Sequence, residues 1–317
     1  VAPPPLPRVA PPFFLRPAPL PFSSSASFAP LPGRQVCARL GVSLAGEDLA
    51  LSRRGGVRRL GCRATERRAQ GEDMAASAGA EAALPKLYYF KGRGKAEIIR
   101  FALGAAGAEW EDCFLRERAA MVQLLQSGKL LYDQVPMLEL PSGQCIVQTN
   151  AILRYVAETH GLHGQTPEER AQVDVLVEGA NDLLGGLIGL PFQAAGLPPG
   201  HRPQDGLQTL MSYHVPRYFG AFERHLAARG SAPDPWMVGK RLTVADTSVL
   251  RCVEECVEWL GAGCLQAYPR ITRWREAVLA HPQVKSFMSG PHRQPPPANP
   301  DVARVYCREV GVTLGRG

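Results

Sequence analysis

The stretch Lys86-Leu-Tyr-Tyr-Phe-Lys-Gly-Arg-Gly94 decides the fold, because a short aromatic strand runs directly into a glycine turn. Aromatic residues favour a strand over residues 86–90, and the two glycines favour the turn that follows. Apolar residues then recur at helical spacing over residues 95–106, and Gly107 ends that pattern. A strand that leads into an amphipathic helix predicts the beginning of an α/β domain.

The next segments continue this alternation of strands and helices. The predicted elements are a strand over residues 110–115, a helix over 119–126, strands over 137–140 and 145–147, and a helix over 149–160. The last two strands form a hairpin around Pro141-Ser-Gly143, residue types typical of turns. Together these elements predict one sheet with helices on its faces, in a domain spanning residues 84–164.

Residues 166–293 have helical patterns only. Thr166-Pro-Glu-Glu169 is a strong helix start, and Thr243-Val-Ala-Asp246 has the spacing of a capping box with Asp in the place of Glu. Helices are predicted over residues 166–190, 204–228, 243–260 and 270–280. The fold class is therefore α/β plus all-α, and residues 294–317 form a tail that covers the substrate pocket.

Residues 1–73 differ in composition from the rest of the chain. They contain 11 Arg, no Lys and 5 acidic residues, whereas the other residues contain 25 basic and 24 acidic side chains. Residues 1–33 alone contain 11 Pro, which disfavours both helices and sheets. We interpret residues 1–73 as a disordered extension that is not part of the mature protein. The alternative is a targeting presequence, since such segments are rich in Arg and Ser.

Composition argues against several classes of function. The net charge of +7 lies mostly in residues 1–73, so the remainder predicts no nucleic-acid interface. No run of roughly 18 apolar residues occurs, so no membrane span is predicted. The 8 Cys include no CxxC pair and no zinc spacing, which predicts no metal site and fits a reducing cytoplasm.

Four motifs in order resemble those of cytosolic glutathione transferases. They are the strand and turn quoted above, Gln134-Val-Pro-Met-Leu-Glu139, Gln148-Thr-Asn-Ala-Ile-Leu-Arg-Tyr155 and Leu242-Thr-Val-Ala-Asp246. The resemblance covers about residues 84–310 and is closest to the vertebrate alpha class. It implies a thioredoxin-like domain followed by an all-helical domain, glutathione as co-substrate and no permanently bound cofactor.

The resemblance assigns the catalytic hydroxyl to Tyr89. The glutathione thiolate is the nucleophile, and lowering a thiol pKa from about 8.5 by about 2 units needs roughly 2.7 kcal/mol. A hydroxyl donor and a cation can supply this energy. Tyr89 is the predicted donor and Lys95, where the alpha class has Arg, the predicted cation. The alternatives are core packing for Tyr89 and a solvated helix start for Lys95.

The other implied glutathione contacts are Gln134, Val135, Gln148, Thr149, Asp182 and Arg217. Val135 precedes a proline that resembles the family's cis-proline turn. Gln148 and Thr149 begin a helix, where free N–H groups favour the γ-glutamyl carboxylate. Asp182 and Arg217 are implied to act across a homodimer, or a heterodimer with a related subunit. Leu125 stands where the alpha class has an Arg for the glycyl carboxylate, and Lys129 is the candidate substitute.

The hydrophobic electrophile is predicted to bind an apolar pocket. Its candidate residues are Phe90, Gly92, Leu187, Ile188, Pro191, Phe192, Tyr306 and Val310. Tyr132 matches the aromatic key that inserts into the partner subunit, and Asp301 takes the place of the Tyr found in alkenal-conjugating relatives.

The predicted function is conjugation of glutathione to hydrophobic electrophiles, as in xenobiotic detoxification, with peroxidase or isomerase side activity. A non-catalytic carrier of apolar ligands is one alternative. A prostaglandin isomerase is another, because Lys95-Ala-Glu-Ile-Ile-Arg-Phe101 resembles the sigma class.

Overall fold

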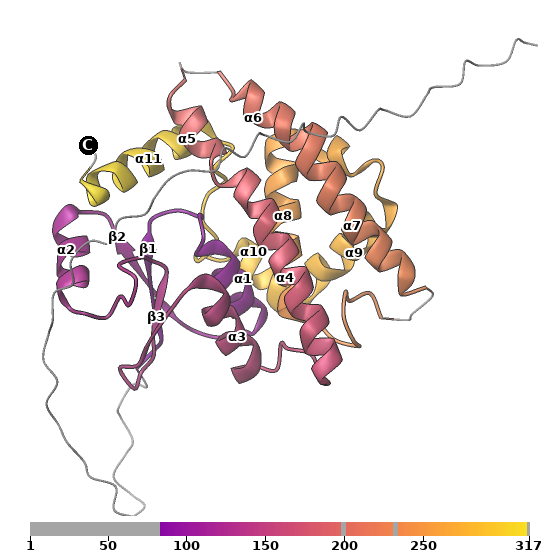
Figure 1. Cartoon of the computed structure of the whole chain (residues 1–317), viewed down its shortest axis with the longest axis horizontal. Helices are drawn as coiled ribbons and strands as arrows, with labels where there is room; N and C mark the ends of the chain where they lie inside the picture. The colour runs from indigo at the N-terminus through magenta and orange to yellow at the C-terminus, as the bar shows by residue number, and fades with distance from the viewer. Residues whose placement is uncertain (1–82, 198–200, 231–233, 316–317) are drawn as a thin grey trace, which may run out of the picture. The chain divides into compact units, whose positions relative to one another are not determined.

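A computed structural model describes residues 83–197, 201–230 and 234–315 (Figure 1). The predicted extension over residues 1–73 lies outside the described residues.

Four strands form one mixed sheet in the order β2-β1-β3-β4. The strands are β1 (Lys86–Phe90), β2 (Glu111–Leu115), β3 (Met137–Glu139) and β4 (Cys145–Val147). The helices around the sheet are α1 (Glu97–Ala105), α2 (Arg118–Gln126) and α3 (Thr149–Thr159). Strand β1 is parallel to β2 and antiparallel to β3. In Figure 1, α2 lies on one side of the sheet and α1 and α3 lie on the other.

The alternation of side chains along β1 decides which tyrosine reaches the site. Leu87 and Tyr89 are buried on one face of the strand. Tyr88 points to the opposite face, where its hydroxyl donates to Oε2 of Glu139 at 3.0 Å. Burial and this bond raise the pKa of Tyr88. Tyr89 therefore points toward the site, and Tyr88 points to the other face of the sheet.

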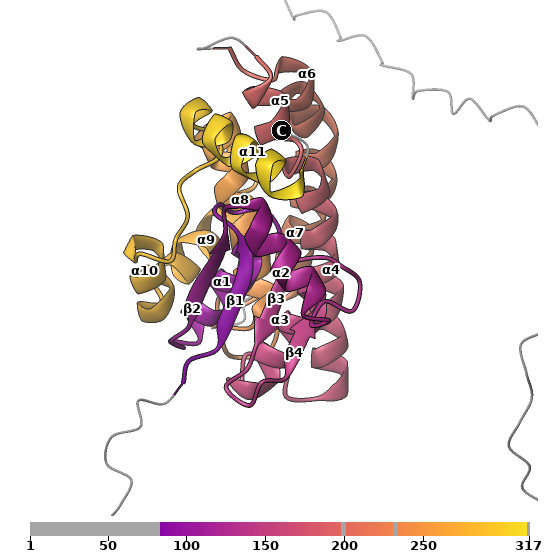
Figure 2. The same ribbon diagram turned by 90° about the vertical axis from the view of Figure 1, so that its left-hand side faces the viewer.

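The second half of the described chain is helical. Its longer helices are α4 (Pro167–Leu187), α7 (Val215–Ala228), α8 (Val244–Leu260), α9 (Pro269–Ala280) and α11 (Pro300–Leu314). Its shorter ones are α5 (Leu190–Ala195), α6 (Gln204–Thr209), the π-helical turn η1 (Leu210–His214), the 3-10 turn η2 (Ala262–Leu265) and α10 (Pro282–Ser289). Figure 2 shows α11 lying above α2 and the sheet, close to α5.

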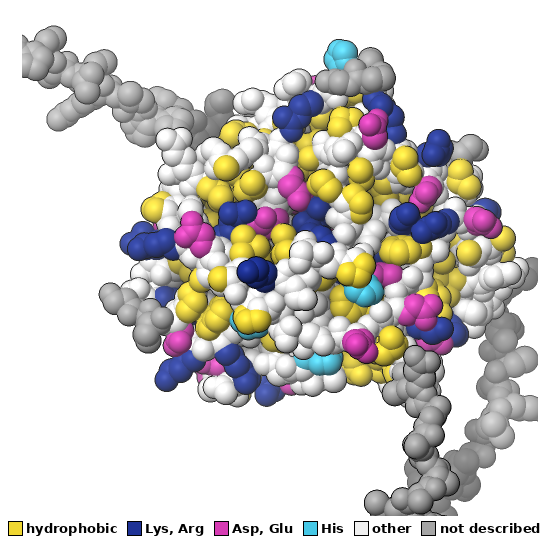
Figure 3. All heavy atoms as spheres, turned by 180° about the vertical axis from the view of Figure 1, so that it is seen from behind, with side chains coloured by type: hydrophobic (Ala, Val, Ile, Leu, Met, Phe, Trp, Pro, Cys, Tyr) yellow, Lys and Arg dark blue, Asp and Glu magenta, His cyan; other side chains and the backbone are white. Residues whose placement is uncertain are grey.

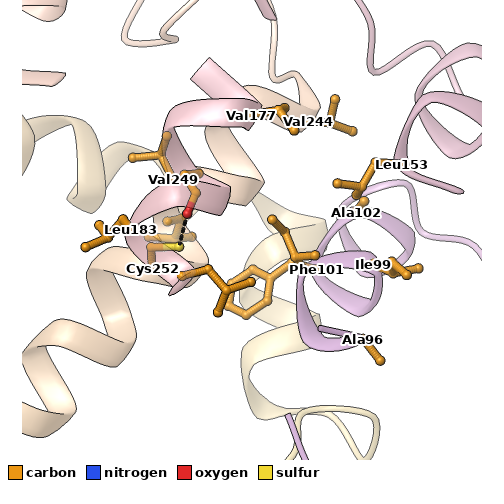
Figure 4. Close-up of a cluster of buried hydrophobic side chains, with 14 of the residues drawn as sticks. Ala96, Ile99, Phe101, Ala102, Leu153, Val177, Leu183, Val244, Val249 and Cys252 are labelled. Atoms are coloured by element: carbon orange, nitrogen blue, oxygen red, sulfur yellow. Dashed lines mark hydrogen bonds between the residues drawn. The ribbon is translucent and has the colours of Figure 1, made fainter. Parts of the chain in front are cut away.

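The core forms where α1 and α3 meet α4 and α8 (Figure 4). Phe101 of α1 is fully buried there, close to α8. The Cys252 thiol of α8 donates to the carbonyl oxygen of Ala180 in α4 at 3.2 Å. Burial raises the pKa of Cys252 to about 11, so the thiol is protonated at neutral pH. Its side chain therefore packs in the core as a small hydrophobic group.

The two capping motifs act as the sequence predicts. The Thr166 side chain accepts a hydrogen bond from the Glu169 N–H at the start of α4. At α8, Asp246 Oδ2 accepts from the Thr243 N–H at 2.9 Å, and the reciprocal bond is also present. Asp246 is fully buried and also accepts from the Trp274 ring N–H. Its carboxylate therefore joins the helix start to α9.

The helical half differs from the prediction in three places. The helix predicted over residues 166–190 ends at Leu187, and α5 begins after Gly189. The segment 204–228 is divided by the π-helical turn. The predicted tail at 294–317 contains α11, which begins at a proline that is tolerated in the first turn.

One helical run, Pro167–Ala195, is long and apolar enough to cross a membrane by length and composition, contrary to the sequence-based expectation. Its apolar side chains, including Val173, Ala180 and Leu183, are buried in the core. The same composition is typical of a core helix, and 44% of the apolar window is buried.

The described surface mixes charges of both signs. Figure 3 shows basic and acidic side chains interspersed on one face, without a continuous basic patch on that face. This distribution agrees with the near-neutral composition beyond residue 73.

We predict that Asp246→Ala lowers the free energy of unfolding by at least about 3 kcal/mol, because several donors lose their buried acceptor. The affected donors include the backbone N–H of Met237, at 2.8 Å, and that of Thr243. Urea unfolding measures the change. Asp205→Ala, at the exposed start of α6, is the matched control and should cost under about 1 kcal/mol. Equal losses in the two variants would contradict the prediction.

Candidate active site

The Tyr89 hydroxyl lies at the end of β1, against the glycine turn. Its oxygen accepts a hydrogen bond from the backbone N–H of Lys95 at 3.0 Å. The Tyr306 hydroxyl also lies close to the Gly94 turn. Burial raises the pKa of Tyr89, although hydrogen bonding and the charges of Arg100 and Arg251 act in the opposite direction. The phenol is therefore protonated at neutral pH and can donate its own proton.

Two glycines allow both tyrosines to approach the turn. Gly94 has φ +39°, and a Cβ at this position would lie 2.4 Å from the Tyr89 hydroxyl oxygen. A Cβ at Gly92 would lie 2.4 Å from a ring carbon of Tyr306. Any side chain at either position would displace a tyrosine.

The charged groups near the phenol come from two helices. Lys95 donates through its backbone, and its side chain is exposed. Arg251 of α8 is buried, pairs with Glu255 at 2.7 Å and reaches the Gly94 carbonyl oxygen at 3.5 Å. Sequence reasoning missed Arg251. The available signal was an Arg and a Glu four residues apart within the helix predicted over residues 243–260.

A buried ionic network fixes the turn in place. Arg93 pairs with Glu258 of α8 and donates from Nε to the carbonyl oxygen of Gln294 at 2.9 Å. Arg100 of α1 donates to the Gly92 carbonyl oxygen at 2.8 Å and pairs with Asp112 of β2, also at 2.8 Å. The turn that carries Gly92 and Gly94 is thus held from three directions.

The residues implied for the peptide part of glutathione lie on two loops. The Val135–Pro136 bond is cis, as the resemblance implies, and the neighbouring Gln134 side chain is exposed. Gln148 has φ +71°, which is unusual for a residue with a side chain, and it directly precedes α3. Thr149 is the first residue of that helix. Backbone strain of this kind often occurs at ligand sites.

The residues implied for the dimer lie on exposed surfaces of the described chain. Tyr132 is 58% exposed, and Asp182 is exposed on α4. Arg217 of α7 donates to the Tyr213 hydroxyl at 2.6 Å and lies over the Tyr218 ring. Tyr213 is also exposed, so these groups are available to a second subunit.

A cavity of about 310 Å³ opens beside the glycine turn. Of the predicted pocket residues, it is lined by Gly92, Ile188, Pro191 and Tyr306. Phe90, Leu187 and Val310 are buried in the core, and Phe192 packs against the Tyr306 ring at 5.8 Å. Sequence reasoning missed part of the lining, namely Arg251, Glu255, Pro295, Pro297, Val302, Val305 and Glu309. The lining is mostly apolar, with one buried ion pair in its wall.

Lys129 is already paired. Its Nζ lies 2.5 Å from Oε1 of Glu139, and the Tyr88 hydroxyl donates to the other oxygen of that carboxylate. Leu125 is half-buried and apolar. Within the described residues, the Lys129 side chain therefore pairs with Glu139 of β3 and does not contact the loop that precedes β3.

The described residues contain no group of three or more His, Cys, Asp or Glu side chains arranged to hold a metal ion. Their cysteines are free thiols, and burial raises the pKa of Cys256 well above its ordinary value.

Comparison with known proteins agrees with this arrangement. Residues 85–158 match the family model of the glutathione S-transferase N-terminal domain, and residues 202–290 match that of the C-terminal domain. The chain is 38% identical over 218 residues to glutathione S-transferase 3 of Gallus gallus, covering 68% of this chain and 90% of that protein. It is 36% identical to glutathione S-transferase A4 of Mus musculus, covering 71% and 97%.

The chain belongs to the glutathione S-transferase family. The predicted family, fold class and enzyme activity are thereby confirmed, and glutathione is the co-substrate.

Solved structures of other glutathione S-transferases share this fold. The enzyme of Ascaris lumbricoides has a TM-score of 0.57 and 28% identity, covering 68% of this transferase and 99% of that chain. A prostaglandin synthase D of Nilaparvata lugens has a TM-score of 0.52 and 25% identity, covering 65% and 97%.

The strained backbone at Gln148 generates a prediction for this transferase. Gln148→Gly removes both the side chain and the strain, whereas Gln148→Ala removes only the side chain. We expect Gln148→Gly to be more stable than Gln148→Ala by about 1 kcal/mol in urea unfolding. Both variants should bind glutathione more weakly by the same factor in calorimetric titration. Restored affinity in Gln148→Gly would contradict a side-chain contact.

Proposed function

We propose that this transferase is an alpha-class-like cytoplasmic enzyme that conjugates reduced glutathione to hydrophobic electrophiles. The observation that carries the proposal is the buried Tyr89 hydroxyl, which lies against the glycine turn beside a mostly apolar cavity. A carrier of apolar ligands needs the cavity but not an oriented phenol. The free cysteines of the described chain support a reducing compartment.

The chemistry follows from the direction of the Tyr89 hydrogen bond. Glutathione loses its thiol proton to solvent, and the Tyr89 O–H donates to the sulfur anion, which lowers the thiol pKa. The sulfur then forms a bond to the electrophilic carbon. With a chloronitrobenzene, chloride leaves with the bonding pair. Tyr89 keeps its proton throughout, because burial raises its pKa.

We place the γ-glutamyl end of glutathione at the start of α3. The backbone N–H groups around Gln148 and Thr149 and the helix dipole favour a carboxylate there. The Val135 backbone and the Gln134 side chain face the cysteinyl part in this proposal. Asp182 then contributes from the neighbouring subunit.

We propose a two-fold dimer in which Tyr132 enters a pocket of the partner. Support comes from the exposure of its ring and of Arg217, which lies with Tyr213 on the same exposed part of the helical half. An isologous arrangement then gives each site the same contributions from the other subunit.

Tyr89→Phe tests the function directly. We expect turnover of a chloronitrobenzene with glutathione to fall about 10²-fold, as for loss of one oriented donor. The pH at which turnover is half-maximal should rise toward the free thiol value of about 8.5. The assay is spectrophotometric conjugation across pH.

Tyr88→Phe is the matched control, because Tyr88 points to Glu139 on the other face of β1. It should leave the pH profile unchanged. Absent turnover in the unaltered protein, or turnover insensitive to Tyr89→Phe, would support the carrier function instead. Isomerisation of a prostaglandin endoperoxide, assayed in parallel, tests the activity named for the Nilaparvata lugens structure.

The glycyl end of glutathione generates a separate prediction. Leu125→Arg should tighten glutathione binding about 5- to 10-fold, since it adds a charge-assisted hydrogen bond. Lys129→Ala should leave the affinity unchanged, because Lys129 pairs with Glu139. Calorimetric titration measures both. Weaker binding in Lys129→Ala would show that this lysine does reach the ligand.

A further inference from the structure

Arg251 is a buried cation in the wall of the apolar cavity. It belongs to α8 and is 2% exposed. The same cavity is lined by Gly92 and Gly94 of the glycine turn. Burying a charge costs free energy, and a hydrophobic side chain in place of a buried ion pair is often as stable. The position of Arg251 therefore needs an explanation beyond packing.

The pairing of Arg251 is incomplete. Its Nη2 lies 2.7 Å from Oε2 of Glu255, one turn further along α8. The other contacts of the guanidinium are long, 3.5 Å to the Gly94 carbonyl oxygen and 3.9 Å to the Cys252 sulfur. Within the described residues, the buried Nε has no hydrogen-bond partner. One carboxylate and two long contacts leave the positive charge able to stabilise a second anion nearby.

Gly94 brings this charge close to the Tyr89 hydroxyl. Its carbonyl oxygen faces Arg251, and a Cβ on the same residue would lie 2.4 Å from the Tyr89 oxygen. Since both contacts meet on one residue, the guanidinium lies within about 9 Å of the phenol oxygen. A charge still acts over this distance in a site partly closed to water. The glutathione sulfur, which receives the Tyr89 hydrogen bond in the proposed function, is therefore close enough to be affected by Arg251.

The other cations near the turn are exposed or more fully paired. Lys95, the cation predicted from sequence, has an exposed side chain. Arg93 pairs with Glu258, and Arg100 lies between two carboxylates, both within 3.0 Å. Of these cations, Arg251 alone combines burial, a place in the cavity wall and an unpartnered nitrogen. The remaining ionisable residues of the cavity wall are Lys91, next to the turn, and Asp301, Tyr306 and Glu309 of α11.

We propose that Arg251 supplies the positive charge that favours the glutathione thiolate, the role that the resemblance gives to Lys95. This inference rests on the proposed function. The thiol proton leaves to solvent, the Tyr89 O–H donates to the sulfur anion, and the guanidinium stabilises that anion through space. Glu255 opposes this effect. The guanidinium is the member of the pair that reaches Gly94, so its influence on the sulfur is the larger.

The thiol pKa of bound glutathione tests the proposal directly. It is measured across pH from the ultraviolet absorbance of the thiolate, as the difference between the protein with and without glutathione. Arg251→Gln should raise this pKa by about one unit, because the favourable charge is lost. Glu255→Gln should lower it, because the opposing carboxylate is lost. A purely structural ion pair would not give shifts of opposite sign.

The rate of conjugation should follow the thiol pKa. At pH values below the thiol pKa of both proteins, kcat/KM for a chloronitrobenzene should fall about 10-fold in Arg251→Gln, since one pKa unit is a tenfold change in thiolate. Above both values the loss should disappear, because the thiolate then forms without help. An equal loss at every pH would overturn the proposal, since it would indicate a packing defect.

A double variant keeps the proposal testable if Arg251→Gln alone does not fold. Arg251→Gln with Glu255→Gln leaves the buried site neutral, and its thiol pKa should lie between those of the unaltered protein and of Arg251→Gln. Glu254→Gln is the matched control, because Glu254 is buried on the same helix and pairs with Arg275, and neither of these two lines the cavity. It should leave the thiol pKa unchanged. An unchanged thiol pKa in both Glu255→Gln and the double variant would overturn the proposal.

Lys95→Ala compares the two candidate cations. A larger rise in thiol pKa in Lys95→Ala than in Arg251→Gln would assign the charge to Lys95 and overturn the proposal. The proposed function fails separately, because the thiol titration needs no turnover. If conjugation is absent while the thiol pKa still shifts in opposite directions in Arg251→Gln and Glu255→Gln, the role of Arg251 stands and the transferase activity does not.

Discussion

The carboxylate of Glu97 holds three segments of the chain together. It is fully buried in α1 and pairs with Arg100 of the same helix at 3.0 Å. It also pairs with Arg93 of the glycine turn at 4.0 Å and with Arg293 of the segment before α11. Burial raises the pKa of this carboxyl, but the charges of Arg293, Arg100 and Arg93 outweigh it and hold the pKa below its ordinary value. A buried charge is tolerated only when it is paired, so these segments must assemble together.

This network includes the turn that follows Tyr89. Arg93 belongs to the turn that follows Tyr89, and its Nε bonds to Gln294 in the segment that leads to α11. Arg293, one residue earlier, pairs with Glu97 at the base of α1. The turn and the C-terminal segment therefore share one electrostatic anchor.

Structural features that depend on residues close together in the sequence were predictable. The aromatic strand and the capping box at Thr243 depend on residues a few positions apart. Helix α11 was not predicted, because the prolines that precede it disfavour a helix and are typical of a tail. The sequence did contain a helix start, since Asn299 caps α11 and Pro300 is accepted in its first turn. The contact between Arg251 and Gly94 joins positions 157 residues apart, so it depends on how α8 packs against the turn and not on local spacing.

Leu125, which stands where the alpha class has Arg, and the Tyr89 hydroxyl affect different kinetic parameters. An Arg on the glycyl carboxylate would stabilise bound substrate and transition state equally, so on the proposed function we expect Leu125 in its place to raise KM without lowering kcat. In that function, Tyr89 donates to the sulfur, where charge is held before attack, and so it affects the nucleophile itself. On the proposed function, the chain therefore lacks one contact to the glycyl carboxylate of glutathione but keeps a hydroxyl donor for the cysteinyl sulfur. Substrate affinity and thiolate formation are separable here because they depend on different residues of the same peptide, the terminal glycine and the central cysteine.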